Sequence, residues 1–311
     1  MDEIRDLLVI VDPTAADQPA VEKAGILAAK LRANVELLAC QTKYSAEVRL
    51  ANQHTRLPPD EAIRRLREWL ESLAVPLRLK GIEVRTSAIS GDPLHESLLN
   101  WIRNSPADIV IKDTHHHSLV RRTFLSNTDW HLIRDCPVAL LLAKATRWHE
   151  PPVLGAAVDP VHDVDTQALL DHRILECARK LAGAFKAPTH IVHAYYPALV
   201  AGAATAGSTG LLAVTPELMA AEKALKTQAI ASLLASCKMS DLSTHVDMGV
   251  PSQYLPAIAE EYHIDILIMG VNARTHLKQA VIGSTAERVL EHLPCDVLAV
   301  KPANLAAALP F

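Results

Sequence analysis

The chain has 311 residues, of which 50% are hydrophobic and 21% charged. This composition allows sizeable buried cores, and disorder is not expected. The net charge of −4, without any block of lysine or arginine, argues against nucleic acid as a main partner. No apolar run is long enough to span a bilayer, so we expect no membrane span. The length favours two domains.

The first residues, MDEIRD, are charged and lack the apolar segment of a signal peptide. The five cysteines are scattered, and no CxxC pair occurs. Neither a zinc ribbon nor a disulfide framework is therefore expected, and a cytoplasmic location is predicted.

Strands and helices are predicted to alternate through the first half of the chain. Apolar runs predict strands at 7–11, 35–39, 84–88, 108–111 and 138–142. One-sided apolar patterns predict helices around 21–31, 62–73 and 94–102. This alternation is typical of a parallel, doubly wound α/β sheet.

The same order repeats in the second half. The strand at 153–158 ends in Asp159-Pro160, as the first strand ends in Asp12-Pro13. Asp265 opens an apolar run, as Asp108 does. The second offset (265 − 108 = 157) exceeds the first (159 − 12 = 147), so the second copy is longer.

We expect the extra residues at 197–215, a segment rich in Ala, Gly and Thr. A flap over a ligand cleft, a wall of an apolar pocket and a plain surface loop are the alternatives for it. A polar link at 144–151, ending in two prolines, predicts the domain boundary. The predicted domains are residues 1–147 and 148–311.

A loop with the features of an anion site lies within 265–290. An apolar strand ends at Met269 and Gly270, a polar and basic loop follows, and a helical pattern begins at Gly283-Ser284-Thr285. The amino end of a helix offers unpaired N–H groups and a dipole that favours negative charge. The two hydroxyl groups add donors, so the stretch predicts phosphate binding.

This stretch resembles the universal stress protein family, whose nucleotide-binding members carry Gly-x2-Gly-x9-Gly-Ser/Thr between the fourth strand and the last helix. Gly270, Ala273, Gly283 and Ser284 stand at that spacing, with Ala273 replacing the second glycine. Both halves resemble family domains, and the pair resembles the tandem, E-type branch. The resemblance implies two Rossmann-like domains, each a five-stranded parallel sheet of order 3-2-1-4-5 with helices on both faces.

The resemblance also implies a ligand, ATP with or without Mg²⁺, in the second domain. In the family an aspartate like Asp159 lies beside the nucleotide, and the adenine lies between the end of the second strand and the end of the fourth. Asp159 could instead cap the next helix. No catalytic residue is predicted. The predicted contacts are Asp159, Ala194, Met269, Gly270, Asn272, Ala273, Gly283, Ser284 and Thr285.

The first half lacks the phosphate loop, because Asp113, His116 and Ser126 replace Gly270, Ala273 and Gly283. A carboxylate at the turn would repel phosphate, so nucleotide is expected in the second domain alone. His115-His116-His117 is not expected to hold a metal, because consecutive loop residues rarely converge on one ion.

Four functions remain alternatives at this point: an ATP-binding stress-response protein without enzymatic activity, a slow Mg-dependent ATPase, a binder of an apolar small molecule in the first half, and an interaction protein with inactive nucleotide sites. Ala273 favours the last two. The intact Gly283-Ser284-Thr285 favours the first two.

The final strand of each half, 138–142 and 297–300, is apolar and should lie at the edge of its own sheet. An uncovered apolar edge invites association. We expect these two edges to pair antiparallel within one chain, because a link of roughly ten residues reaches at most ~35 Å. The result would be an intramolecular pseudo-dimer, and a further homodimer through other surfaces stays open.

Overall fold

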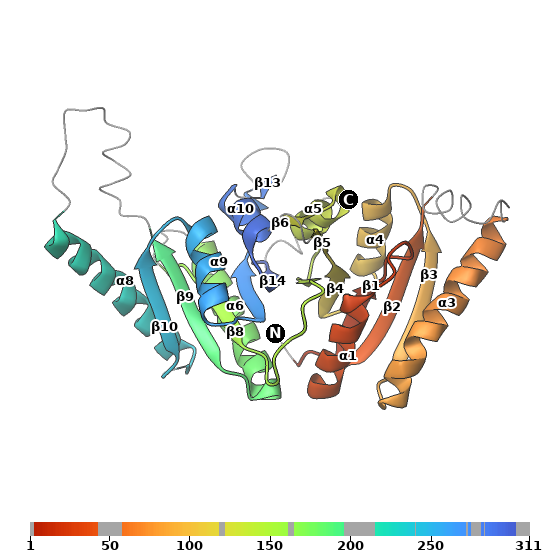
Figure 1. The fold of residues 1–311 in the computed structure, drawn as a ribbon, viewed down its shortest axis with the longest axis horizontal. Coiled ribbons are helices and arrows are strands. Elements are labelled where there is room, and N and C mark those ends of the chain that lie inside the picture. Colours follow the sequence, from red (N-terminus) through yellow and green to blue (C-terminus); the bar gives the residue numbers. More distant parts are fainter. Residues whose placement is uncertain are drawn as a thin grey trace.

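The computed structural model describes residues 3–42, 58–117, 122–160, 165–195, 215–239, 241–271, 273–274, 281–282 and 284–302. One ten-stranded sheet runs through the molecule in the order β10-β9-β8-β11-β14-β7-β4-β1-β2-β3 (Figure 1). The predicted segment 197–215 lies outside the described residues, apart from Thr215. In the described ranges, no helix is both long and apolar enough to cross a membrane.

Each half of the sheet has the predicted order 3-2-1-4-5 with parallel neighbours, so this expectation is confirmed. The strands of the first domain are β1 (Asp6–Ile10), β2 (Asn34–Gln41), β3 (Val84–Ser90), β4 (Ile109–Asp113) and β7 (Ala139–Ala143). Those of the second are β8 (Leu154–Ala157), β9 (Thr189–Tyr195), β10 (Ser243–Met248), β11 (Ile266–Gly270) and β14 (Asp296–Val300).

Helices cover both faces of the sheet, so most strands are apolar on both sides. One face packs against α1 (Pro19–Leu31), α3 (Pro59–Leu79), α6 (Asp165–Phe185) and α8 (Pro216–Ser236). The other packs against α4 (Leu94–Arg103), α5 (Asn127–Asp135), α9 (Pro251–Glu261) and α10 (Ser284–His292).

The repeated aspartates before β4 and β11 play matching roles. Asp108 Oδ2 accepts hydrogen bonds from the backbone N–H groups of Arg5 and Asp6, at 2.7 and 3.0 Å. Asp265 Oδ2 accepts one from the N–H of Val153 at 2.7 Å. Each carboxylate therefore fixes the start of the first strand in its own domain.

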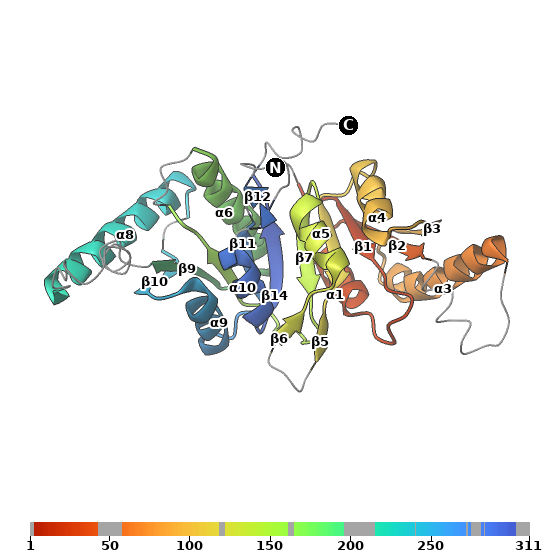
Figure 2. The same ribbon diagram turned by 90° about the horizontal axis from the view of Figure 1, so that it is seen from above.

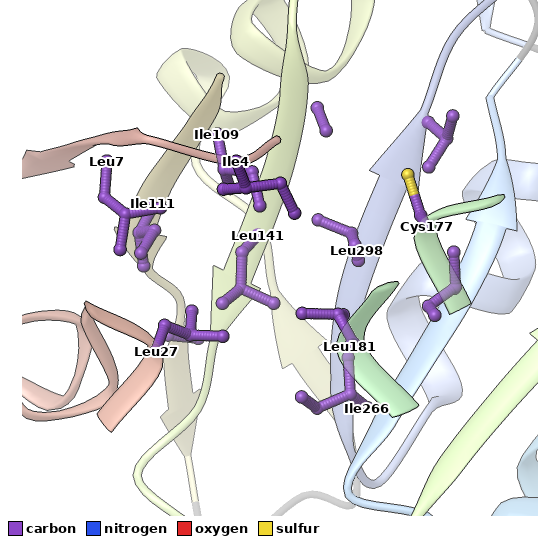
Figure 3. Packing of buried hydrophobic residues seen from close by; sticks show 14 of the residues in the cluster. Ile4, Leu7, Leu27, Ile109, Ile111, Leu141, Cys177, Leu181, Ile266 and Leu298 are labelled. Carbon is purple, nitrogen blue, oxygen red and sulfur yellow. The ribbon is translucent and has the colours of Figure 1, made fainter. Parts of the chain in front are cut away.

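The two domains meet where β7 and β14 pair antiparallel, with Leu141 opposite Leu298. Figure 2 shows these strands side by side at the middle of the molecule. We call this junction of β7 and β14 the seam. In Figure 3, Leu141 and Leu298 lie next to each other across the seam, with Leu27 of α1 and Leu181 of α6 nearby. The expected pseudo-dimer is confirmed, and one hydrophobic cluster continues through both domains.

A short hairpin follows the fourth strand in each domain, where the sequence suggested only a loop. β5 (His115–His117) pairs with β6 (Arg122–Phe124), and β12 (Ala273–Arg274) pairs with β13 (Val281–Ile282). The hairpins cross the seam: β6 lies against α10, and β13 lies against α5 (Figure 1). The two contacts are reciprocal, as an approximate twofold axis requires.

Two buried lysines repeat this reciprocity. Lys144 follows β7, and its ammonium group donates to the carbonyl of Leu293 in the second domain. Lys301 follows β14 and donates to the carbonyl of Cys136 in the first domain at 2.6 Å. The residues correspond across the repeat, since 301 − 144 and 293 − 136 both equal 157. Each lysine thus satisfies a carbonyl group beyond the last helix of the other domain.

One buried ion pair at the seam has no such repetition. Lys23 Nζ of α1 lies 2.6 Å from Asp296 Oδ2, with side chains that are 5% and 0% exposed. Asp296 also accepts from the N–H of Lys144 at 2.8 Å and from Trp148 Nε1 at 2.9 Å. These bonds satisfy the buried carboxylate and tie the first helix of one domain to the last strand of the other.

We predict that Asp296→Ala lowers the free energy of unfolding by about 3–5 kcal/mol, because it leaves the Lys23 ammonium buried without its counter-ion. Adding Lys23→Met should recover part of the loss, since it removes the stranded charge. Urea unfolding followed by circular dichroism measures both variants. A double variant no more stable than Asp296→Ala would contradict this account.

Candidate functional site

The predicted site residues that the structure describes gather at the carboxyl ends of three neighbouring strands. Asp159 follows β8, Ala194 lies in β9, and Met269 and Gly270 end β11. Because β8 lies between β9 and β11, these positions share one edge of the sheet. Asn272 and Gly283 lie outside the described residues. For Ala273, Ser284 and Thr285 only the backbone is described: Ala273 pairs with Ile282, and the other two open α10.

Asp159 keeps a half-exposed carboxylate, with the side chain 41% exposed, and its backbone is held by buried groups. Its N–H donates to Asp171 Oδ1 of α6 at 3.1 Å. The preceding carbonyl, on Val158, accepts from His193 Nδ1 of β9 at 2.8 Å. Asp171 and His193 are 0% and 3% exposed. Sequence reasoning did not single out Asp171, because nothing in its helix distinguishes a buried carboxylate from a solvated one.

Gly270 has a packing role. A Cβ atom added there would lie 2.5 Å from Leu170 Cδ2, closer than van der Waals contact permits, and 3.3 Å from Ile174 Cδ1, which is a tight contact. Leu170 belongs to the additional turns of α6, which has 21 residues against 13 in α1, a difference of 8. The helix covers the end of β11 because position 270 carries no side chain.

In the first domain the corresponding position is Asp113, and its carboxylate serves the fold. Asp113 Oδ1 accepts from the N–H of Ala20 at 2.6 Å, near the start of α1. A carboxylate directed at the first turn of a helix is stabilised by the unpaired N–H groups and the dipole there. Asp113 was expected to repel phosphate, and the structure adds that it caps α1.

The amino end of α5, which corresponds to that of α10, is capped by a carboxylate of the chain itself. Ser126 and Asp129 form a capping box, in which each side chain accepts from the other residue's N–H. Asp129 is fully buried and lies 2.7 Å from the ammonium group of Lys112. The Ser-x-x-Asp pattern was visible in the sequence, but its partner Lys112 was not identifiable there.

At α10 the position that corresponds to Asp129 is Ala286, since 129 + 157 = 286. The position that corresponds to Lys112 is Met269, since 112 + 157 = 269. The buried ion pair of the first domain is therefore replaced by two apolar residues. The N–H groups at the start of α10 face no carboxylate from position 286, and an external anion could take that place.

His190 and His193 are three residues apart on β9, so their side chains point to opposite faces of the sheet, and their partners differ accordingly. His193 bonds to the Val158 carbonyl, whereas His190 Nδ1 lies 2.8 Å from His245 Nε2 of β10. Both rings of the His190–His245 pair pack against Tyr262, at the end of α9. One of the two facing nitrogens must be unprotonated for a hydrogen bond to form.

We predict that low pH lowers the stability of the second domain through the His190–His245 pair. Burial lowers the pKa of His190, with a further contribution from His245, and burial also lowers the pKa of His245, against the opposing charges of Glu261 and Asp247. The pKa of a histidine in an unfolded chain is about 6.5, so protons bind the unfolded chain first as the pH falls. The free energy of unfolding should therefore decrease below that pH.

Urea unfolding at pH 7.5 and pH 5.5 tests this prediction. The variant His190→Gln/His245→Gln lacks the pair and should lose less stability between the two pH values than the wild-type protein. Equal losses would show that the pair does not contribute.

The described residues contain no group of three or more His, Cys, Asp or Glu side chains that could hold a metal ion. The side chains of His115, His116 and His117 lie outside this description, so their role stays a prediction. We predict that metal analysis of untagged protein finds no stoichiometric zinc that depends on these histidines. One zinc per chain that disappears when all three are replaced by alanine would overturn this.

Comparison with known proteins agrees with the fold and with the repeat. The model of the universal stress protein family matches residues 3–144 and 161–301. Universal stress protein E of Escherichia coli (strain K12) is 25% identical over 319 residues, which cover 96% of this chain and 94% of that protein. Its counterpart from Photorhabdus laumondii is 26% identical, covering 97% and 96% of the two chains.

Two solved structures share the architecture over nearly their whole length. A functionally unknown protein from Pseudomonas aeruginosa PAO1 superposes with a TM-score of 0.73 at 25% identity, covering 98% of this chain and 95% of that one. A universal stress protein from Archaeoglobus fulgidus gives 0.71 at 16% identity, with coverage of 96% and 99%, and shows the fold alone. With its strand order and both family matches, the chain belongs to the universal stress protein family and carries two of its domains in tandem.

Proposed function

We propose that this chain is a cytoplasmic stress-response protein that binds ATP in its second domain and acts through nucleotide occupancy without hydrolysis. The observation that carries the proposal is the difference between two equivalent helix starts. α5 is capped by Ser126 and Asp129, whereas α10 has Ala286 where Asp129 would stand. An anionic ligand would supply at α10 the negative charge that the first domain supplies from within.

The remaining predicted contacts fit a nucleotide that lies along this edge of the sheet. Its phosphates would meet the backbone of Gly283, Ser284 and Thr285. The adenine would lie between Ala194 and Met269, and Asp159 would stand beside the nucleoside. Of these, Met269 is buried, and Asp159 and Ala194 are partly exposed at the ends of neighbouring strands. Mg²⁺ would accompany the phosphates as their counter-ion.

A second candidate is an interaction protein that binds no nucleotide. It is favoured by the β12–β13 hairpin, in which Ala273 is paired with Ile282 and β13 lies against α5. The paired residues of this hairpin thus have a structural role between the domains that needs no ligand.

We predict that calorimetric titration with ATP and Mg²⁺ gives one site per chain, in the second domain. Ser284→Ala should weaken binding by about 1 kcal/mol, or about fivefold, because one neutral hydrogen bond is lost. Gly283→Val should weaken it further by blocking the approach of phosphate to the backbone. Asn127→Ala is the matched control, because Asn127 stands at the position of the first domain that corresponds to Ser284 (127 + 157 = 284), and it should leave ATP affinity unchanged. Nucleotide bound to the first domain alone, or no binding at all, would refute the assignment.

A further inference from the structure

One peptide unit at the second domain's site is held from both sides by buried polar side chains. Its carbonyl oxygen, on Val158, accepts from His193 Nδ1 at 2.8 Å. Its N–H, on Asp159, donates to Asp171 Oδ1 at 3.1 Å. Since a carbonyl oxygen only accepts, the facing Nδ1 of His193 carries the proton. We call His193 and Asp171 together the peptide clamp.

Among its described residues, the first domain has no counterpart of this pair of polar groups. The register pairs Leu154 with Thr189 in the second domain and Leu7 with Val35 in the first. Four residues further along β9 and β2, the counterpart of His193 is therefore Ala39, which is completely buried. Asp171 lies on the additional amino-terminal turns of α6. The first domain thus builds the same strand pair around an alanine.

Burying an imidazole and a carboxylate costs free energy that an apolar pair would not, even when both are hydrogen-bonded. Since the first domain avoids this cost, the two residues have a use in the second domain, and the site beside them provides one. The orientation of the clamped peptide sets the direction in which the next side chain, that of Asp159, leaves the backbone. That carboxylate is 41% exposed at the edge of the sheet, with Oδ1 3.9 Å from His193 Nδ1.

A carboxylate accepts hydrogen bonds and donates none when ionised. Asp159 can therefore meet a hydroxyl or amino group of a ligand, whereas a phosphate oxygen would be repelled. Phosphate recognition, at the start of α10, belongs to a different element of the domain. The two ends of a nucleotide would in this way be recognised by separate groups.

We propose that Asp171 and His193 are positioning residues, which orient Asp159 to accept a hydrogen bond from the nucleoside part of the ligand and so make the second domain select nucleoside triphosphates over bare polyphosphate. This inference rests on the proposed function. It adds a selectivity that phosphate binding at α10 would not produce.

The test titrates the full chain with ATP, 2′-deoxy-ATP, inosine triphosphate and inorganic tripolyphosphate. Wild-type protein should bind ATP more tightly than tripolyphosphate. Weaker binding of 2′-deoxy-ATP would identify a ribose hydroxyl as the donor, and weaker binding of inosine triphosphate would identify the base amino group. Equal affinity for all four ligands would overturn the inference while leaving the proposed function intact.

Variants then test the clamp itself. Asp171→Ala and His193→Ala should weaken ATP binding about tenfold and leave tripolyphosphate binding unchanged. Asp171→Asn keeps an acceptor oxygen and should retain most of the affinity for ATP. Cys177→Ala, also buried on α6, is the matched control and should change neither ligand's affinity.

The ratio of the two affinities separates positioning from stability. Equal weakening of ATP and tripolyphosphate in Asp171→Ala, or unchanged ATP binding, would show that the clamp is only structural and would overturn the inference. If a clamp variant does not fold, equal affinity of the wild-type protein for ATP and tripolyphosphate would still overturn the inference. Wild-type protein that binds neither ATP nor tripolyphosphate would refute the proposed function and this inference together.

Discussion

The antiparallel pairing of β7 with β14 is the contact on which the rest of the molecule depends. Each strand is completely buried along its length, and each would be an open apolar edge if its domain stood alone. Joining them removes both edges and brings the last helices, α5 and α10, next to the hairpins of the opposite domain. The lysines that follow the strands can then reach carbonyl groups across the seam. The pairing of these two strands thus brings the buried lysines to acceptors in the other domain. Without those acceptors, burying the lysines would be too costly.

The seam also explains how the two copies differ. In the first domain the charges are directed inward: Lys112 pairs with Asp129, Asp113 caps α1, and Lys23 reaches Asp296 of its neighbour. In the second domain the positions that correspond to Lys112 and Asp113 are Met269 and Gly270. The first copy supports the pair structurally, and the second keeps the edge that a ligand could use.

The alternation of strands and helices, the repeat and the apolar character of the two final strands could be predicted because they rest on local patterns. The strand order, and with it the position of the final strands at the sheet edges, came from the resemblance to the family. Apolar runs at regular intervals, repeated Asp-Pro turns and two apolar final strands each point to one arrangement. The helix α8 was not predicted, since only Ile230, Leu233 and Leu234 among its residues are buried hydrophobics, while Leu225 is 66% exposed. Its apolar residues form no clear stripe. The Lys23–Asp296 pair was equally inaccessible, because its partners are 273 residues apart and only the folded seam joins them.

The site was predictable as a location but not as a mechanism. The spacing of Gly270, Ala273 and Gly283 places a loop at the correct edge of the sheet. The structure shows, however, that the absence of a side chain at Gly270 makes room for Leu170 of α6. The same position in the first domain carries Asp113, where α1 begins later and leaves an N–H group to be capped. The two domains therefore differ both in this residue and in the length of the neighbouring helix: Asp113 accompanies the shorter α1, and Gly270 accompanies the longer α6. A glycine at a motif position is by this argument weak support for phosphate binding. The stronger support lies at Ala286. The first turn of α10 keeps one acid, Glu287, but has no carboxylate at the position from which Asp129 caps α5, and a bound anion would satisfy the donors there.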